Sequence, residues 1–550
     1  MATSISSSEP VLGVLLSERE KMLLLLSLAM CMFLSSLDGS IVSTALPVML
    51  ADLGGFQLLS WVFTLYMLTS TVVVPIVGKL SDMFGRRPFV ISGVVIFLIG
   101  SLGSGLAPTM ITLIIARGVQ GIGGGFILAC VLVVMADMYT PIERAKYVGY
   151  ILAIITAGSL LGPPVGGFFA DGPGWRWCFF INLPIGAIAL ATIWATLPNT
   201  RQGGRIGDID FTGAAVLTAA TVAGLLASAW AYEAYGWGSA ITVGLLVAAG
   251  VLLVLFVLQE LRHPNAIIPM SLFRNRMYVL TGIIAILSSA VLFSAAIFLP
   301  TFIQTSLGAS AKVSGFLFMP QAAGLVVMSF IGGRIVAKTG RFKQLVVIGC
   351  ALSGLAAFLL QTMGVGDPRW HVALYMVVFG MGSGLVTPLI NVIVQASVSQ
   401  EETGVATSSQ MYFRQIAQVL GVALFGVLFT TSYTSSFAGN LDEEVRAAMP
   451  EAVYEELEGD ATLALDPGRF EETRSSFLEA GGTVALFERA LDAQKEAVAV
   501  ANKRLFLISA IGGVLLVALS LALTEIPLRG RKSAPAPQEE EQPATASASR

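Results

Sequence analysis

Charged side chains are scarce in this sequence. Of its 550 residues only 12% are Asp, Glu, Lys or Arg, whereas 55% are hydrophobic and the mean hydropathy is +0.80. A soluble globular protein carries about 25% charged residues, so this composition excludes a soluble protein. One bilayer crossing needs about 20 apolar residues, and the chain has room for many crossings. The composition therefore predicts a polytopic membrane protein.

Histidine and cysteine are also rare, with two and four copies. His263 and His371 lack metal-ligand spacing, and the cysteines stand in apolar runs without a CxxC pattern. Nucleophile elbows and phosphate-binding loops are missing as well. These absences argue against a metal site, a membrane-embedded enzyme and an ATPase. We expect no cofactor, no metal and no nucleic-acid partner.

Long apolar runs alternate with breaks at Gly, Pro and charged residues along most of the chain. They predict an all-α fold with fourteen transmembrane helices. The predicted spans are 22–47, 57–77, 88–107, 109–137, 145–170, 175–197, 209–232, 239–261, 278–305, 312–337, 343–364, 370–397, 403–431 and 503–525.

The basic residues are distributed unevenly between alternate loops. With the N-terminus inside, the predicted cytoplasmic segments hold most of them, and the short external loops hold only Arg176, Lys312 and Arg369. Lys and Arg are retained on the cytoplasmic side of short loops. The distribution therefore predicts an even number of crossings with both termini in the cytoplasm.

Residues 432–502 form a long external connection rich in Asp and Glu, in which 484–498 has a helical pattern. We expect a small acidic cap on the outer face. A solvated connector and a substrate-handling or partner-docking role are both open for it. The tail from Ser533 is rich in Pro, Ala, Ser and Glu, a composition typical of disorder.

A short basic loop framed by two glycines occurs twice, as 78–87 and as 333–342. Internal repeats of this kind are typical of transporters built from repeated bundles. The second copy keeps the glycines and loses charge, because Ala337 stands for Asp82, Phe342 for Arg87 and, in a later helix, Phe379 for Arg117. We infer that ion coupling lies mainly in the first half and that the second half shapes the substrate cavity.

Two charged residues lie deep inside predicted spans. Asp38 precedes Pro47 by nine residues and Arg117 follows Pro108 by nine, so both lie about 13 Å inside the outer boundary. Charges at this depth are costly and are functional candidates. An Asp38–Arg117 pair predicts either a proton switch, in which hydration and spacing control the charge of Asp38, or a permanent pair that holds two helices together.

Two polar stripes follow helical spacing. Arg117, Gln120, Gly121 and Gly124 share one helix face, and Gln410, Arg414 and Gln418 share another in the thirteenth span. Either stripe could line a cavity or serve interhelical hydrogen bonding. The candidate substrate cavity comprises Phe33, Phe63, Tyr66, Gln120, Gln410, Arg414 and Gln418.

The fifth span contains closely spaced glycines and prolines, namely Gly158, Gly162, Pro163, Gly166 and Gly167. Glycines four residues apart permit close helix packing, and prolines remove backbone donors and bend a helix. Such a helix can re-pack at low cost.

Taken together, these motifs resemble the major facilitator superfamily, in particular its fourteen-helix drug:H+ antiporter branch of EmrB/QacA type. The segment 37–47 resembles the first-helix signature of that branch and 175–184 its sixth-helix entry. The resemblance implies a charge latch at the inner gate, formed by Gly78, Asp82, Gly85, Arg86 and Arg87. It also implies proton transfer at Arg117 and an exporter signature at Gly158, Gly162, Pro163, Gly166 and Gly167.

The resemblance implies two six-helix bundles with an inserted helix pair. The expected organisation is a cytoplasmic N-terminus at 1–21, a first bundle at 22–198, the inserted pair at 199–262, five helices of the second bundle at 263–431, the external acidic loop at 432–502, the last helix at 503–525 and a disordered cytoplasmic tail at 526–550. The expected location is the cytoplasmic membrane of a bacterium.

The function that we predict is proton-driven export. Protonation of Asp38 from outside would change its interaction with Arg117 and release a small substrate outward. Because Asp38 is the one acid placed clearly inside the membrane, lipophilic cations or neutral lipophiles are the expected substrates, with membrane lipids around the protein. Alternatives are export of an endogenous lipid, siderophore or secondary metabolite, and a non-transporting sensor. A protein partner for the 432–502 loop is also open.

Overall fold

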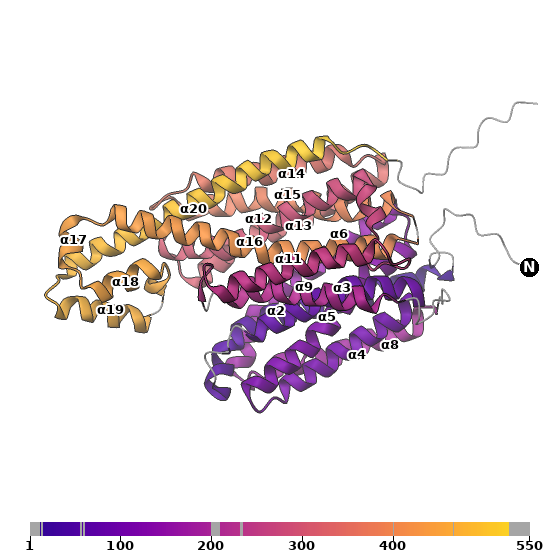
Figure 1. The fold of residues 1–550 in the computed structure, drawn as a ribbon, viewed down its shortest axis with the longest axis horizontal. Helices are drawn as coiled ribbons and strands as arrows, with labels where there is room; N and C mark the ends of the chain where they lie inside the picture. Colours follow the sequence, from indigo (N-terminus) through magenta and orange to yellow (C-terminus); the bar gives the residue numbers. More distant parts are fainter. Residues whose placement is uncertain are drawn as a thin grey trace, which may run out of the picture.

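The computed structural model describes residues 12, 15–54, 58, 61–199, 209–231, 235–399, 401–465 and 467–526. Within these ranges the secondary structure is helical throughout, without strands. The prediction of an all-α membrane protein is therefore confirmed. Figure 1 shows the long helices lying side by side along one direction, with a group of short helices beyond one end.

Twelve helical segments of the described residues are long and apolar enough to cross a membrane. They are α2 (Glu18–Leu53), α3 (Trp61–Phe84), α4 (Arg86–Gly105), α5 (Met110–Met138), the pair α7 (Trp177–Phe180) and α8 (Asn182–Thr196), α11 (Ala240–Glu260), α12 (Arg276–Thr305), α13 (Ala311–Thr339), α14 (Lys343–Gln361), α15 (Arg369–Ser397), α16 (Thr403–Asn440) and α20 (Val484–Leu521).

Two further helices occupy the remaining predicted spans. They are α6 (Pro141–Asp171) and α9 (Phe211–Leu226), whose apolar stretches are shorter, 154–170 and 211–226. Every predicted span therefore overlaps a helix. The number of fourteen crossings stays a prediction, because two of the helices are short for a bilayer.

The first bundle consists of α2 to α8, in which α6 packs on α2 and α5 packs on α3 and α4. The second consists of α12 to α16 and α20, in which α13 packs on α15 and α14 packs on α15 and α20. The bundles meet along two seams, α3 with α16 and α6 with α13. In Figure 1 the first bundle is indigo to purple and the second pink to yellow.

The inserted helices α9 and α11 pack on each other beside one seam. α9 also contacts α3, and the π-helical turn η3 (Ala227–Ala231) that follows it contacts α16. Thr221 of α9 shares a 2.6 Å hydrogen bond with the Tyr412 hydroxyl of α16. The apolar residues of α11 are largely exposed, among them Val247 and Val254. This exposure is what a lipid-facing helix requires.

A glycine with positive φ lies in the basic loop of both halves of the repeat. Gly85 has φ 93° and Gly340 has φ 68°, a region that L side chains rarely adopt. Gly85 begins α4 and Gly340 ends α13, so each glycine reverses the chain between two membrane helices. We call the end of the bundles that contains these two turns the inner end, because the distribution of basic residues assigns it to the cytoplasm.

The acidic segment forms a packed helical cap. Its predicted edges, 432 and 502, fall inside α16 and α20, which both extend beyond the bundle (Figure 1). The helices α17 (Glu443–Ala448), α18 (Glu451–Gly459) and α19 (Pro467–Glu479) bury apolar residues against them. The predicted helix over 484–498 is confirmed as the first part of α20.

Candidate functional site

Asp38 of α2 and Arg117 of α5 form an ion pair in the middle of the first bundle. The distance from Arg117 Nη1 to Asp38 Oδ2 is 2.5 Å, and both side chains are 0% exposed. The structure thus brings together the two residues that the sequence places at equal depth. A buried pair of this kind is stable only when its remaining polar atoms are also satisfied.

Two amides complete the surroundings of the Asp38 carboxylate. Gln120 Nε2 donates to Asp38 Oδ1 at 2.8 Å, and Asn182 Nδ2 donates to the same oxygen at 3.0 Å. Arg117 Nη1 also donates to Gln120 Oε1 at 2.7 Å. All three groups that contact the carboxylate are hydrogen-bond donors, and they connect α2 with α5 and α8.

Glycines let α5 approach α3 closely enough to stack the arginine on an aromatic ring. The Arg117 guanidinium lies 4.3 Å from the centre of the Tyr66 ring, within range of a cation–π interaction. A Cβ at Gly121 would overlap the backbone of Tyr66, and one at Gly124 would lie 2.7 Å from the Tyr66 hydroxyl. Tyr66 therefore contacts the Asp38–Arg117 site, and its role in lining a substrate cavity stays a prediction.

Asn182 is a member of the site to which sequence reasoning gave no role. It lies at the start of α8 and also donates to Ser101 Oγ at 3.0 Å, and Ser101 in turn donates to the carbonyl of Phe179 at 2.8 Å. The position of an Asn inside the apolar run 177–196 could have indicated this role, because polar groups at membrane depth are rarely without function.

The predicted latch lies at the inner end of α3. Asp82 and Arg86 form a buried ion pair, and Arg86 Nε contacts Asp137 Oδ2 of α5 at 3.0 Å. Asp82 Oδ2 accepts a hydrogen bond from the backbone N–H of Val405 in α16 at 2.8 Å. The latch therefore joins the two bundles. Neither Asp137 nor the Val405 backbone was among the predicted members.

Small residues permit this contact between bundles. A Cβ at Gly78 would overlap Ser408 of α16, and a Cβ at Gly404 would overlap the Asp82 carboxylate. A second link lies nearby, where Arg144 donates to Gln395 Oε1 of α15 and to the carbonyl of Ala136. Burial lowers the pKa of Arg144 to about 10, so it stays protonated at neutral pH. The bundles are closely packed at the inner end.

The structure does not bring Arg87 into the latch. Its Nη2 donates to the carbonyl of Trp194 at 2.7 Å, and its guanidinium lies 5.6 Å from the Trp194 ring. Arg86 and Arg87 are adjacent at the start of α4 and contact different neighbours, so a latch role for Arg87 stays a prediction. Arg87 instead connects α4 with α8.

The exporter signature divides into two parts. A Cβ at Gly158 would lie 2.9 Å from the carbonyl of Phe33 in α2, and one at Gly162 would overlap Ser40. Gly166 is also buried, whereas Gly167 has no neighbour within 4 Å of its Cβ direction. α6 remains helical through Pro163. Gly158 and Gly162 therefore form the close contact with α2, and Gly167 takes no part in it.

The remaining cavity candidates lie in both bundles. Phe33 lies against Gly158, and Phe63 packs at the edge of an apolar cluster in the first bundle. On α16, Gln410 is 1% exposed and neither atom of its amide has a partner. Arg414 Nε donates to Ser289 Oγ of α12 at 3.2 Å. Gln418 lies two turns beyond Gln410 and is partly buried.

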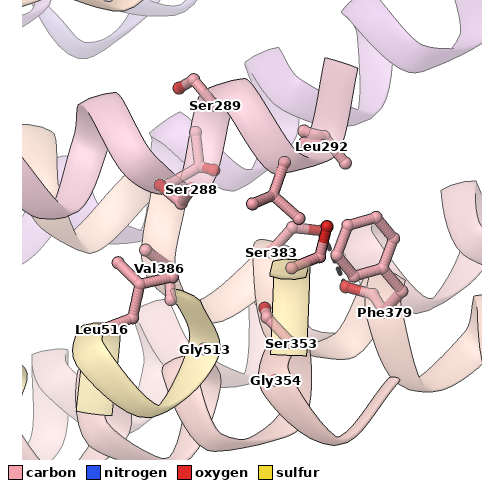
Figure 2. Close-up of a pocket in the computed structure, with 13 residues that line it drawn as sticks. Ser288, Ser289, Leu292, Ser353, Gly354, Phe379, Ser383, Val386, Gly513 and Leu516 are labelled. Atoms are coloured by element: carbon pink, nitrogen blue, oxygen red, sulfur yellow. Dashed lines mark hydrogen bonds between the residues drawn. The ribbon is translucent and has the colours of Figure 1, made fainter. Parts of the chain in front are cut away.

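A small cavity lies inside the second bundle, between α12, α14, α15 and α20 (Figure 2). Its volume of about 20 Å³ has room for one water molecule, far below that of a ligand pocket. Ser289, the partner of Arg414, belongs to its lining, as does Phe379. Figure 2 shows the Ser383 hydroxyl bonded to the Phe379 carbonyl beside this space, at 3.0 Å.

Metal-ligating side chains do not gather in the described part of the chain, where no group of three or more His, Cys, Asp and Glu is suited to an ion. All four cysteines are buried and unpaired. The charged groups at membrane depth thus interact with arginines, amides and backbone groups. Such an arrangement can exchange protons and change helix contacts.

Comparisons with known proteins agree with this architecture. The family model described as Major Facilitator Superfamily matches residues 28–210 and 211–422. The chain is 38% identical to the multidrug transporter protein MdtP of Bacillus subtilis, over 75% of this chain and 76% of that protein. It is 33% identical to multidrug resistance protein 3 of the same organism, over 74% and 80% respectively.

A solved structure shares the fold at much lower sequence identity. The proton:xylose symporter XylE bound to 6-bromo-6-deoxy-D-glucose superposes with a TM-score of 0.56 at 16% identity, covering 92% of this chain and 97% of that one. At this identity the likeness concerns the arrangement of helices alone.

Proposed function

The chain belongs to the Major Facilitator Superfamily, and we propose that it is a proton-coupled antiporter that exports lipophilic or amphiphilic small molecules. It is a multi-pass membrane transporter and not an enzyme. We further propose that it belongs to the fourteen-helix drug:H+ antiporter branch and resides in a bacterial cytoplasmic membrane with both termini inside. The proton gradient is its energy source, and it needs no cofactor.

The observation that carries this proposal is the fully buried network around Asp38. Its carboxylate is held by Arg117, Gln120 and Asn182, which come from two helices other than α2. Protonation removes the charge that these donors stabilise and weakens the attraction between α2, α5 and α8. Proton binding and a change in helix packing are therefore energetically linked at this site.

A change in helix packing at Asp38 would act on the contacts between the bundles at the inner end. The bundles are joined there by the Asp82–Val405 and Arg144–Gln395 contacts, which must break before a cytoplasmic substrate can enter. α2 carries Asp38 and packs along α6, which in turn packs on α13 of the other bundle. A change at Asp38 therefore has a direct path to the seam between bundles.

The inward movement of protons can supply the free energy for export. An inward-moving proton gains about 2.3 kcal/mol per 100 mV of membrane potential, in addition to the pH gradient. This gain favours protonation of Asp38 from outside and deprotonation inside. Substrate must then bind the two states with different affinity, since otherwise no coupling arises.

The test uses inverted vesicles with an acidified interior. A panel of lipophilic cations, neutral lipophiles and organic anions is added outside, and proton release is recorded for the wild type and for Asp38→Asn. We expect substrate-dependent proton release from the wild type and none from the variant. Asp52→Asn is the matched control, because Asp52 pairs with Arg176 at the exposed surface. Full proton-driven transport by correctly inserted Asp38→Asn would refute the proposal.

A further inference from the structure

Arg414 is a cation deep in the second bundle that lacks an acidic partner. It lies eleven residues after Thr403, the first residue of α16, which places it about 16 Å along the helix from that end. In the described part of the chain its one hydrogen bond goes from Nε to Ser289 Oγ at 3.2 Å. A serine hydroxyl carries no charge, so the guanidinium is not neutralised.

Two arginines of the first bundle do have acidic partners. Arg117 pairs with Asp38, and Arg86 pairs with Asp82 and Asp137. No ion pair forms at Arg414 among the described residues, where its hydrogen-bond partner is the neutral Ser289 hydroxyl. A charge inside a membrane protein normally faces a partner or a water-filled space. Arg414 therefore has the properties of a group whose partner arrives from outside the protein.

The free side of the guanidinium is accessible. The atoms Nη1 and Nη2 have no hydrogen bond in the described structure, yet they are not among the atoms closed off from solvent, as Arg117 Nη2 is. Arg414 as a whole is only half-buried. Ser289 holds the Nε side and leaves the two terminal nitrogens as a fork. Such a fork fits the two oxygens of a carboxylate, sulfonate or phosphate.

Gln410 adds a second polar group on the same face of α16. It lies one helical turn from Arg414, is 1% exposed, and has neither a donor nor an acceptor for its amide. An unpaired amide at this depth costs free energy unless a ligand or water satisfies it. Arg414 and Gln410 together offer a positive fork and an amide donor to one anionic group.

We propose that Arg414, supported by Gln410, binds the anionic head group of an amphiphilic substrate in the second bundle. This inference rests on the proposed export function and specifies its substrate class. It differs from the sequence-based expectation of monovalent cations or neutral lipophiles, which rested on Asp38 being the one acid at membrane depth. Asp38 accepts hydrogen bonds from three neighbours within the protein.

The experiment measures binding of three probes with one naphthalene ring and different head groups. They are naphthalene-2-sulfonate, 2-naphthol and (2-naphthylmethyl)trimethylammonium, titrated by calorimetry into the full-length protein in phosphatidylcholine nanodiscs without a pH gradient. We expect the sulfonate to bind at least about tenfold more tightly than the cation, because a charge-assisted bidentate contact is worth more than this factor. Equal or reversed preference, or no binding of any probe, overturns the inference.

Variants assign the preference to Arg414. Arg414→Gln should abolish the preference for the sulfonate, and Arg414→Lys should keep part of it, because Lys retains the charge and loses the planar fork. Arg474→Gln is the matched control, since Arg474 lies in the cap and pairs with Glu471. Unchanged sulfonate affinity in folded Arg414→Gln overturns the inference, and Arg414→Lys answers the same question if the Gln variant does not fold.

The anion could be a soluble amphiphile or an anionic lipid. Repeating the titration in nanodiscs that also contain phosphatidylglycerol separates the two sources. Loss of sulfonate binding there identifies a lipid head group as the occupant, and unchanged binding identifies a soluble amphiphile. Because these measurements need no proton gradient, their outcome is independent of the Asp38→Asn transport assay, and the two proposals can fail separately.

Discussion

The two bundles share one arrangement of helices and turns, but their deep arginines have different partners. Both contain the glycine turn at the inner end, at Gly85 and Gly340. In the first bundle Arg117 and Arg86 are paired with carboxylates, whereas in the second Arg414 has a serine as its hydrogen-bond partner among the described residues. Phe379, which takes the place of Arg117 in the repeat, is buried beside the small cavity. The comparison shows that the fold depends on turns and close packing, and that charge is free to differ.

The inner turn of the second bundle is held by other means. Phe342, at the position of Arg87, is 1% exposed, and the backbone N–H groups of Phe342 and Lys343 donate to Glu525 after the last helix. A carboxylate at the start of α14 satisfies free backbone donors and favours the helix dipole. This turn is therefore fixed within one bundle, whereas the turn at Gly85 adjoins the contact between bundles.

The largest expected effect comes from breaking the paired arginine and comparing it with the lone one. Arg117→Gln leaves the Asp38 carboxylate buried without a counter-ion and should lower the free energy of unfolding by about 3–5 kcal/mol. Arg414→Gln loses one hydrogen bond to Ser289 and should cost no more than about 1.5 kcal/mol. Equilibrium unfolding in mixed micelles measures both. An equal loss of unfolding free energy in the two variants would mean that Arg414 also has a strong partner within the protein, contrary to the comparison of the bundles.

The latch gives the next largest effect. Arg86→Gln leaves Asp82 and Asp137 without their cation, and it should weaken the closed inner end by about 1.5–3 kcal/mol, the value of a charged hydrogen bond. Arg341→Gln is the matched change at the corresponding turn of the second bundle, where no ion pair of Arg341 is found among the described residues, and should alter export less than twofold. Export rates measured in vesicles for the two variants test this expected difference. A larger loss at Arg341 would reverse the assignment of the latch to the first bundle.

Close packing should matter equally in both bundles. A Cβ at Gly162 would overlap Ser40 of α2, and a Cβ at Gly380 would overlap the carbonyl of Gln321 in α13. Each Gly→Ala change should cost about 1–3 kcal/mol through overpacking. Gly167→Ala is the control, because nothing lies within 4 Å of its Cβ direction. Melting temperatures of the three variants test this, and a stable Gly380→Ala protein would show that only the first bundle needs the contact.

The smallest expected effect on stability comes from the ion pairs at the surface of the cap, in contrast to the buried ion pairs of the first bundle. Burial alone would raise the pKa of Asp460, but hydrogen bonds from Thr462 and the nearby Arg469 outweigh it and hold that pKa below its ordinary value. Asp460 therefore stabilises the cap above its ordinary pKa of about 3.9, and this contribution is lost as the pH falls through the lower folded-state value. We expect less than about 1 kcal/mol. In Asp460→Asn, hydrogen exchange in α18 and α19 should no longer show this pH dependence. If the pH dependence remains in the variant, another acidic residue causes it.

Much of the architecture could be predicted because it depends on local properties. Apolar length gave the spans, and the fixed rise of a helix placed Asp38 and Arg117 at one depth. Asn182, Asp137 and the backbone of Val405 could not be predicted in the same way. Their roles depend on which helix faces which neighbour, and helical spacing within one span carries no information on this.

The sequence by itself determined that this chain is an all-helical membrane protein with a repeated framework and a few charges at depth, because hydrophobic length, glycine turns and residue type act locally. Only the tertiary structure decided that Asp38 accepts bonds from three donors, that Arg86 and Arg87 have different neighbours, and that Arg414 meets a serine and no acid among the described residues. These facts depend on how helices distant in the sequence pack together, which sets the partners of every buried charge.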